Sequence, residues 1–384
     1  MSFVATFNSL PATALCRYAQ NATAVDVETA LGRPSLESFA ALISPSADLE
    51  QLAILAHATT LRYFGKVIRL YAPLYLSNEC INICRYCGFS RDNPILRVTL
   101  TPEQVVAEAR YLRTEGFRHI LLVAGEHPHF VSNNFLRDCV AQLRPEWPSI
   151  ALEVGPLETG DYRPIVDAGA EGLVIYQETY NREVYAAMHA SGPKMNFDWR
   201  LETPERAYQA GFKRLGIGAL LGLADWRSEA IAVAAHIQYL LKHCWRAQIT
   251  VSVPRIRPAA GEFQPLTQVT DRELVQFVCA LRLTFPEVGI ALSTRETATL
   301  RDGLIPLGVT MISAGSHTEP GGYTGQGRAD LHLTKAGRRI ESEGEHATVQ
   351  FEIADNRSPA QVASKLNMLG YEPVWKDWDI SLNG

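Results

Sequence analysis

Short runs of apolar and β-branched residues alternate with amphipathic stretches along most of the chain. Eight of these runs have the length and composition of buried strands. They cover residues 67–76, 119–124, 150–154, 172–177, 214–218, 249–253, 289–294 and 310–314. Strands that alternate with helices form βαβ units and a parallel sheet, and eight such units suit closure. The pattern therefore predicts an α/β fold, a (β/α)8 TIM-type barrel.

Cap residues mark where several of the intervening helices begin. Thr101 is followed by Pro102 at the first helical position and by Gln104 at the third. Thr270 is likewise followed, three residues later, by Glu273. A threonine followed by a glutamate or glutamine at this spacing forms a capping box. Residues 1–65 also have a helical pattern, with a helix at 49–63 that leads into the first strand, and we expect them to pack outside the barrel.

The pattern changes after about Ser316. Pro320-Gly-Gly-Tyr323 begins a polar, glycine-rich stretch without an apolar period until residues 349–353, which predicts a long loop. A short helix at 359–369 follows, and then a segment at 371–379 whose Trp375-Lys-Asp-Trp378 should dock on the body. We expect three parts: an N-terminal helical extension (1–65), the barrel (66–318), and a C-terminal loop and helical segment packing on the barrel (319–384).

Composition and charge narrow the functional classes. The 384 residues are 47% hydrophobic and 20% charged, which is ordinary for a globular protein, and the formal net charge is −5. No basic field exists that would attract nucleic acid or an anionic membrane. The longest apolar run, about 215–224, is too short to span a bilayer, and no secretory leader is evident. We expect a cytoplasmic protein with no nucleic-acid or membrane partner.

Three of the seven cysteines lie within eight residues, directly after the first predicted strand. Cys80, Cys84 and Cys87 have a C-x3-C-x2-C spacing and offer three thiolates from one loop. A structural zinc site needs a fourth ligand, and this loop has none at the usual spacing. A cubane 4Fe-4S cluster held by three thiolates keeps one iron open, and the amino and carboxylate groups of S-adenosylmethionine can chelate it.

This segment resembles the signature of the radical S-adenosylmethionine superfamily, including the aromatic Tyr86 before the last cysteine. The resemblance implies that Tyr86 lies near the adenine of the cofactor. Ala124-Gly125-Glu126, at the end of the second strand, is similar to the Gly-Gly-Glu element of the superfamily, from which Ala124 departs. That element implies that the Glu126 carboxylate accepts hydrogen bonds from the cofactor's ammonium.

Much of the chain also resembles one family of this superfamily, the 2-iminoacetate synthases or tyrosine lyases of thiamine biosynthesis. The stretches that carry the resemblance are Ala72-Pro-Leu-Tyr-Leu-Ser-Asn78, Tyr176-Gln-Glu-Thr-Tyr180, Phe197-Asp-Trp-Arg-Leu-Glu-Thr-Pro204, Ser293-Thr-Arg-Glu296, Pro320-Gly-Gly-Tyr323 and Trp375-Lys-Asp-Trp378. The family implies that a 5′-deoxyadenosyl radical removes hydrogen from the amino group of L-tyrosine. The Cα–Cβ bond then breaks, giving 2-iminoacetate (dehydroglycine) and p-cresol. Thiazole synthase is implied as the acceptor of 2-iminoacetate, and flavodoxin or ferredoxin as the electron donor.

The resemblance also implies site residues. For the substrate these are Arg295, whose guanidinium fork suits a carboxylate, Tyr75 near the substrate amine, and Ser313 with Ser316 in the pocket wall. For the cofactor, Arg200 would neutralise its carboxylate, and Glu178 would contact its ribose or amino group. The rival for Arg295 is an ion pair with Glu296. Arg255 and Arg257 either line the pocket or form ion pairs at the barrel rim.

Three alternatives remain at this stage. A related maturase takes tyrosine further with a second cluster on C-terminal cysteines, but no cysteine follows Cys279, which argues against it. A tryptophan lyase would share the barrel and Arg295 and differ mainly in pocket size. A non-catalytic iron-sulfur carrier would need the three cysteines but no amino-acid pocket.

Overall fold

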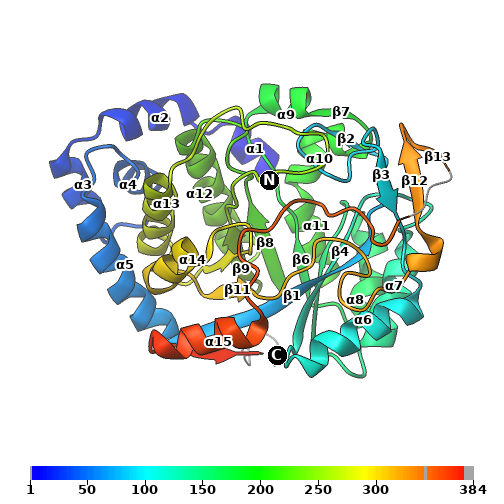
Figure 1. Cartoon of the computed structure of the whole chain (residues 1–384). Coiled ribbons are helices and arrows are strands. Elements are labelled where there is room, and N and C mark those ends of the chain that lie inside the picture. Colours follow the sequence, from blue (N-terminus) through cyan, green and yellow to red (C-terminus); the bar gives the residue numbers. More distant parts are fainter. Residues whose placement is uncertain (1, 341–343, 376–384) are drawn as a thin grey trace.

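A closed barrel of eight parallel strands forms the centre of the computed structural model, which describes residues 2–340 and 344–375 (Figure 1). The barrel strands are β1 (Val67–Ser77), β4 (His119–Ala124), β5 (Ser149–Glu153), β6 (Gly172–Val174), β8 (Arg214–Gly218), β9 (Gln248–Ser252), β10 (Gly289–Leu292) and β11 (Met311–Ser313). Each strand pairs with the next, and the pairing of β11 with β1 closes the circle. All eight predicted runs form strands, so the predicted (β/α)8 barrel is confirmed.

Helices connect the strands and cover the outside of the barrel. They are α6 (Pro102–Thr114), α7 (Asn133–Leu143), α8 (Thr159–Asp167), α9 (Arg182–Met188), α10 (Phe197–Leu201), α11 (Thr203–Ala210), α12 (Trp226–His243), α13 (Asp271–Thr284) and α14 (Ala298–Leu304), with short 3-10 turns η1 (Pro193–Met195) and η2 (Ile305–Leu307). Capping boxes begin α6 at Thr101 and α13 at Thr270, as predicted. These caps satisfy backbone N–H groups that the first helical turn leaves unpaired.

The N-terminal region is helical and lies on the outside of the barrel, as predicted. Its helices are α1 (Phe3–Asn8), α2 (Ala12–Asn21), α3 (Ala24–Ala30), α4 (Leu36–Leu42) and α5 (Leu49–Phe64). Helices α2 to α5 lie on one side of the molecule, where α2 and α4 pack on α12 and α5 packs on α13, while α1 contacts α12 and α10 (Figure 1). Fully buried Phe3 and Phe39 join the same hydrophobic core as the barrel strands.

The polar stretch after residue 320 is not simply the predicted long loop. It contains a short 3-10 turn, η3 (Arg328–Asp330), and a hairpin of β12 (His332–Lys335) and β13 (Arg338–Ile340), which pairs with β3 (Ile95–Arg97) in an antiparallel sheet. Ala336 and Gly337 form the hairpin turn with φ of 49° and 74°. Alanine is an unusual residue at positive φ, so the sequence lacked the common Asn-Gly turn signal.

The C-terminal segment returns to the start of the barrel. Helix α15 (Pro359–Met368) matches the predicted helix, and β14 (Glu372–Val374) pairs in parallel with the first residues of β1. The Trp375 ring packs edge-on against Phe117 with ring centroids 5.0 Å apart, so this tryptophan docks as predicted. The remainder of the predicted docking segment, residues 376–379, lies outside the described residues.

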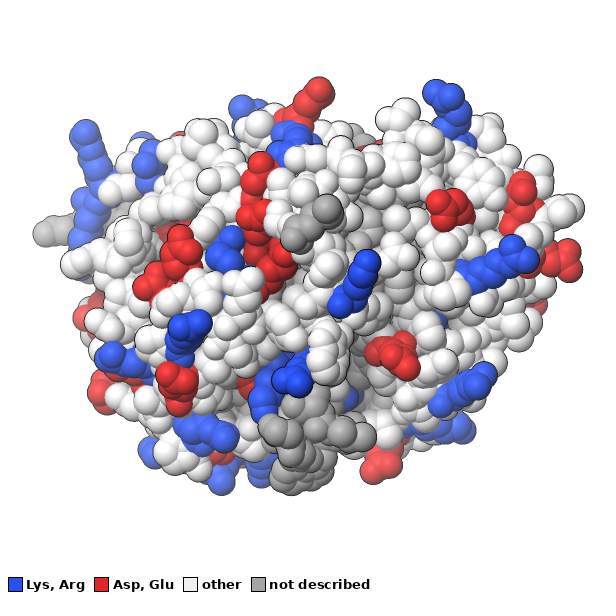
Figure 2. Space-filling view, turned by 180° about the vertical axis from the view of Figure 1, so that it is seen from behind, with Lys and Arg blue, Asp and Glu red and all other residues white. Residues whose placement is uncertain are grey.

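Charged side chains of both signs occur on the surface of the molecule. On the face shown in Figure 2, positive and negative side chains are interspersed among uncharged ones. Among the described residues, no helix combines the length and the apolar character that a membrane crossing requires.

Glu108 of α6 fixes the glycine-rich segment that follows the barrel. Its buried carboxylate accepts hydrogen bonds from the backbone N–H groups of Tyr323 and Thr324, both at 2.9 Å, and from the Thr324 hydroxyl. Tyr323 in turn donates to the carbonyl of Pro73 in β1, at 2.7 Å. The Pro-Gly-Gly-Tyr motif is therefore tied to the barrel wall by the Glu108 carboxylate and by the Tyr323 hydroxyl.

We predict that Glu108→Ala lowers the free energy of unfolding by about 2 kcal/mol, because it removes the charged acceptor that the partly buried hydrogen bonds of Tyr323 and Thr324 share. Glu108→Gln keeps one acceptor oxygen and should lose less. Urea unfolding measures both, and limited proteolysis should cut residues 320–330 faster in the alanine variant. An alanine variant as stable as the wild type would contradict this role.

Candidate active site

The three-cysteine loop leaves β1 at the carboxyl end of the barrel. Within it, the short strand β2 (Ile83–Cys84) pairs with β7 (His189–Ser191), which follows α9. Cys84 is buried beside Tyr86 and Met188, whereas Cys80 and Cys87 are half-buried and pack near Tyr75. The loop therefore lies over the end of the barrel where catalytic groups gather in this fold.

Arg97 holds the two ends of the cysteine loop together. This arginine is 2% exposed, and its Nη1 donates to the carbonyls of Asn78 and Phe89, at 2.5 and 3.1 Å, while its Nη2 donates to that of Ser90 at 2.8 Å. Its Nε donates to the Thr334 hydroxyl in β12, at 2.5 Å. One buried guanidinium thus joins the start of the loop, its end and the C-terminal hairpin.

The thiols have the chemistry of an iron-sulfur site. Burial raises the pKa of the Cys84 and Cys87 thiols, and Lys194 partly opposes this, so a metal must displace their protons. Amide groups of Asn82 and Gln350 lie 3.7 Å from Cys80 Sγ and 3.9 Å from Cys87 Sγ as donors to sulfur. No group of three ligands in the described residues is close enough for one metal ion. A cubane fits this donor set, because each thiolate then ligates a different iron.

The loop that carries Glu126 passes very close to the start of the cysteine loop. A Cβ at Gly125 would lie 2.2 Å from the carbonyl oxygen of Glu79, so only glycine fits there. A Cβ at Gly155 would lie 2.6 Å from the Glu126 side chain. Glu126 accepts a 2.7 Å hydrogen bond from Asn82, which lies between Cys80 and Cys84. The two glycines therefore let the carboxylate reach the cysteine loop.

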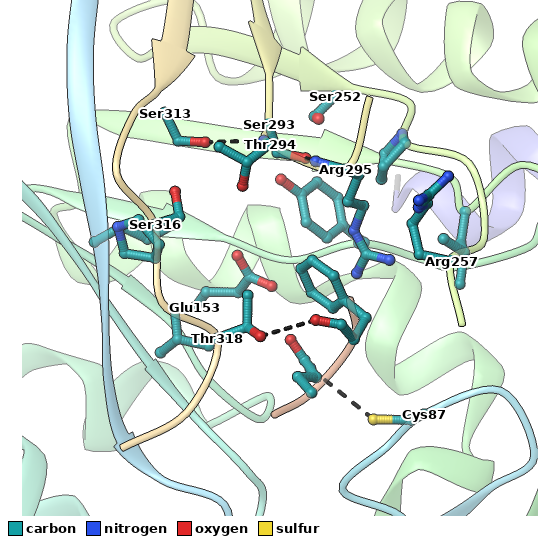
Figure 3. A pocket seen from close by; sticks show the side chains of 18 of the residues that line it. Cys87, Glu153, Ser252, Arg257, Ser293, Thr294, Arg295, Ser313, Ser316 and Thr318 are labelled. Carbon is teal, nitrogen blue, oxygen red and sulfur yellow. Dashed lines mark hydrogen bonds between the residues drawn. The ribbon is translucent and has the colours of Figure 1, made fainter. Parts of the chain in front are cut away.

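A cavity with an empty volume of about 980 Å³ opens at the barrel mouth (Figure 3). Its lining includes seven of the predicted site residues, namely Tyr75, Tyr86, Cys87, Glu178, Arg295, Ser313 and Ser316. Four others are absent from its lining, namely Cys80, Cys84, Glu126 and Arg200. This single space therefore brings predicted cofactor and substrate residues together at the barrel mouth.

Glu178 has an unusual backbone conformation, and its carboxylate forms ion pairs with two cations. Its backbone φ is 72°, which is rare for a residue other than glycine and is often found at functional sites. The carboxylate lies 2.6 Å from Lys194 Nζ and 3.5 Å from Arg200 Nη2. Burial raises the pKa of Glu178, but Lys194 and Arg200 outweigh it and hold the pKa below its ordinary value. Arg200 also donates to the carbonyl of Tyr176, at 2.7 Å.

Arg295 presents an uncompensated guanidinium to the cavity. Its Cζ lies 3.3 Å from the centre of the Phe351 ring, so the two groups stack. No carboxylate of the described residues forms an ion pair with it, and Glu296, the predicted rival partner, pairs with Arg255 instead. Arg255 therefore forms an ion pair at the barrel rim, whereas Arg257 lines the cavity.

The remaining predicted side chains are fixed by hydrogen bonds. Tyr75 donates to Gln350 Oε1 at 2.7 Å, and the Tyr86 hydroxyl lies 2.8 Å from His189 Nε2. Ser313 Oγ accepts a 3.2 Å hydrogen bond from the backbone N–H of Thr294. The buried Ser316 hydroxyl has no partner among the described residues, so a ligand can use it.

Sequence reasoning missed several cavity residues. Glu153 ends β5, Lys194 follows β7, and Gln350 and Phe351 come from the C-terminal segment. Glu153 had a signal, since it is the only charge inside the apolar run at 150–154. The C-terminal residues had none, because their position depends on how the chain returns over the mouth.

Comparison with known proteins gives consistent matches. A profile of the radical SAM superfamily matches residues 74–232, and one of the Biotin and Thiamin Synthesis associated domain matches residues 252–372. The 2-iminoacetate synthase of Escherichia coli (strain K12) is 43% identical over 93% of this chain and 91% of its own. That of Salmonella typhimurium (strain LT2) is 42% identical over the same shares. The crystal structure of HydG, a maturase of the FeFe-hydrogenase, superposes with a TM-score of 0.86 and 30% identity over 96% of this chain and 80% of its own.

We predict that serine at Cys80, Cys84 or Cys87 abolishes binding of a cluster with about four irons per chain, because each thiolate holds a separate iron. Iron analysis and the visible and paramagnetic resonance spectra of anaerobically reconstituted protein measure this. Cys16→Ser, at a half-buried cysteine on α2, is the matched control and should keep wild-type iron. Retention of the full iron content by a loop variant would contradict the assignment.

Proposed function

The chain belongs to the 2-iminoacetate synthase family within the radical SAM superfamily, and from that premise we propose that it cleaves the Cα–Cβ bond of L-tyrosine. The products are 2-iminoacetate (dehydroglycine) and p-cresol, with 5′-deoxyadenosine and methionine from the cofactor. One observation supports this most directly. A cavity bordered by Cys87 of the cluster loop also contains Arg295, a stacked cation without a carboxylate partner in the described part of the chain.

The family uses a 4Fe-4S cluster and S-adenosylmethionine, which together supply a 5′-deoxyadenosyl radical when bound. In our proposal Cys80, Cys84 and Cys87 hold the cluster. Glu126 accepts hydrogen bonds from the cofactor's ammonium, since its carboxylate lies within reach of the cysteine loop through Asn82.

Two further contacts would orient the rest of the cofactor. Tyr86 borders the cavity beside Cys87 and offers an aromatic face to the adenine. Arg200 and Glu178 already form an ion pair beside the cavity. Arg200 can therefore bind the carboxylate of the cofactor, and Glu178 its ribose or amino group, without a large movement. Pre-organised groups of this kind reduce the entropy that ligand binding costs.

The amino-acid end of the substrate would lie between β10, β11 and β1. Arg295 binds its carboxylate, because a guanidinium fork forms two parallel hydrogen bonds with that group. Tyr75 and Ser313, on the neighbouring strands, place the amino group. The departing 4-hydroxybenzyl fragment delocalises its unpaired electron into the ring, so little acid–base chemistry is needed. Orientation is therefore the main contribution of the protein.

Exclusion of water is the second contribution. Gln350 and Phe351 cover the cavity from the C-terminal segment, and the Thr318 hydroxyl donates to the Phe351 carbonyl at 2.9 Å. Gly88 of the cysteine loop lies against the same segment, since a Cβ there would be 2.4 Å from the Gln350 carbonyl oxygen. A covered site protects a radical from quenching and the imine product from hydrolysis.

We also propose two partners on chemical grounds. Because 2-iminoacetate hydrolyses readily, direct transfer to an acceptor enzyme is favourable, and thiazole synthase is the acceptor that we propose. The cluster must receive electrons singly at low potential, for which flavodoxin or ferredoxin is the proposed donor.

A tryptophan lyase is the second candidate, because Arg295 and a cavity of about 980 Å³ suit either amino acid. An iron-sulfur carrier is a weaker alternative, since it would not need an uncompensated arginine in an enclosed pocket.

We predict that the anaerobically reconstituted enzyme, with reductant and S-adenosylmethionine, converts L-tyrosine to p-cresol and releases about one 5′-deoxyadenosine for each p-cresol. Mass spectrometry of the products measures both. An indolic product from tryptophan with none from tyrosine would favour the second candidate. Absence of 5′-deoxyadenosine under any condition would favour a carrier.

We predict that Arg295→Gln raises the KM for tyrosine about 100-fold, because it removes the charge that holds the carboxylate. Arg295→Lys keeps the charge but loses the fork, so its KM should lie between the two. Affinity for S-adenosylmethionine should not change. Arg110→Gln, at an exposed ion pair on α6, is the control. An unchanged KM in the glutamine variant would show that another group binds the carboxylate.

A further inference from the structure

Glu153 is a charged group in the cavity to which the roles described above assign nothing. It is the last residue of β5, and the strand registers place it in one row with Val123 of β4 and Tyr75 of β1. Its side chain lines the cavity, and none of the described residues forms a hydrogen bond to it. A carboxyl group in such a position is costly unless a ligand satisfies it.

The surroundings explain why Glu153 lacks a partner in the protein. Tyr71, Tyr75 and Tyr176 lie around it, since burial and then the charge of Glu153 raise the pKa of all three phenols, and Tyr75 donates its hydrogen bond to Gln350 instead. Burial and the negative charge of Glu178 raise the pKa of Glu153 to about 7, and Arg295 opposes them. The pocket wall therefore contains one carboxyl group whose hydrogen-bonding capacity is unused.

The strand order places Glu153 across the barrel from Arg295. Counted from β1 around the closed sheet, β5 is the third strand and β10 is the seventh, which is half a turn in an eight-stranded barrel. Arg295 follows β10, and Figure 3 shows its guanidinium and the Glu153 carboxylate both pointing into the cavity. A ligand whose carboxylate is bound by Arg295 thus extends its far end toward Glu153.

We infer that Glu153 accepts a hydrogen bond from the phenol hydroxyl of the substrate and so selects a 4-hydroxyphenyl side chain over a phenyl side chain. This inference rests on the proposed function, because it takes the ligand to be an aromatic amino acid held at Arg295. A carboxylate is a strong acceptor for a phenol, and a site built around such a contact rejects ligands that lack the hydroxyl.

The main rival is that Glu153 binds the substrate ammonium. Both groups are donors, but the two contacts have different consequences for a ligand without a hydroxyl. If Glu153 contacts the ammonium, its removal weakens the binding of tyrosine and of phenylalanine equally. If Glu153 contacts the phenol, its removal weakens the binding of tyrosine and leaves the binding of phenylalanine nearly unchanged.

The test is a measurement of binding without turnover. Anaerobically reconstituted holoenzyme with S-adenosylmethionine and no reductant is titrated calorimetrically with L-tyrosine and with L-phenylalanine. The wild type should bind tyrosine about 10- to 100-fold more tightly than phenylalanine. Glu153→Met keeps the length of the side chain without its polarity. The ratio of its affinity for tyrosine to its affinity for phenylalanine should fall to about one. Glu153→Gln keeps an acceptor without the charge, and its ratio should fall about threefold or more.

Glu158→Gln is the matched control, since this exposed glutamate lies on the same connection between β5 and α8 and caps no backbone group. Its two affinities should match those of the wild type. The inference is overturned if the wild type does not prefer tyrosine, if Glu153→Met keeps the preference, or if that variant weakens both ligands equally. Production of p-cresol by the wild type tests the proposed function separately, so the two failures are distinguishable.

Discussion

Everything in the site depends on how an eight-residue loop with three cysteines is held over the open end of the barrel. Free thiols on a mobile loop would not keep the spacing that a cubane needs, and the loop has little regular structure of its own. Buried Arg97 provides the constraint by binding the carbonyls of Asn78, Phe89 and Ser90. Because it also donates to Thr334, the C-terminal hairpin becomes part of the same support.

The charges around the cavity fall into two groups with different consequences. Glu178 forms ion pairs with both Lys194 and Arg200, so these three groups form a preset polar surface, with one net positive charge, on the side of the cysteine loop. Arg295 and Glu153 have no such partners among the described residues and lie on opposite sides of the barrel. A buried charge without a partner is costly for stability, and sites of this kind are commonly reserved for ligands. Their separation suits a molecule with an anionic head and a hydrogen-bond donor at its far end.

Much of the barrel could be predicted from the sequence, because the spacing of hydrophobic residues and the capping of helices are local properties. The eight strands, the capping boxes at Thr101 and Thr270, and the position of the cysteines after β1 all follow from neighbouring residues. The position of the residues that cover the cavity does not follow from neighbouring residues. Gln350 and Phe351 reach the mouth only because Glu108 fixes the segment after the barrel and β12 pairs with β3. Such long-range contacts leave no periodic signal, and the turn at Ala336 and Gly337 lacks the common Asn-Gly pair.

The central claim is that the cavity places the amino group of tyrosine, rather than a carbon, beside the reactive position of the cofactor. Hydrogens on nitrogen exchange with solvent, whereas those on Cα and Cβ of tyrosine do not on the timescale of turnover. The most direct test is therefore turnover of ordinary L-tyrosine in deuterated water, followed by mass spectrometry of the 5′-deoxyadenosine. The account predicts one deuterium in that product, and 5′-deoxyadenosine that carries none would contradict it.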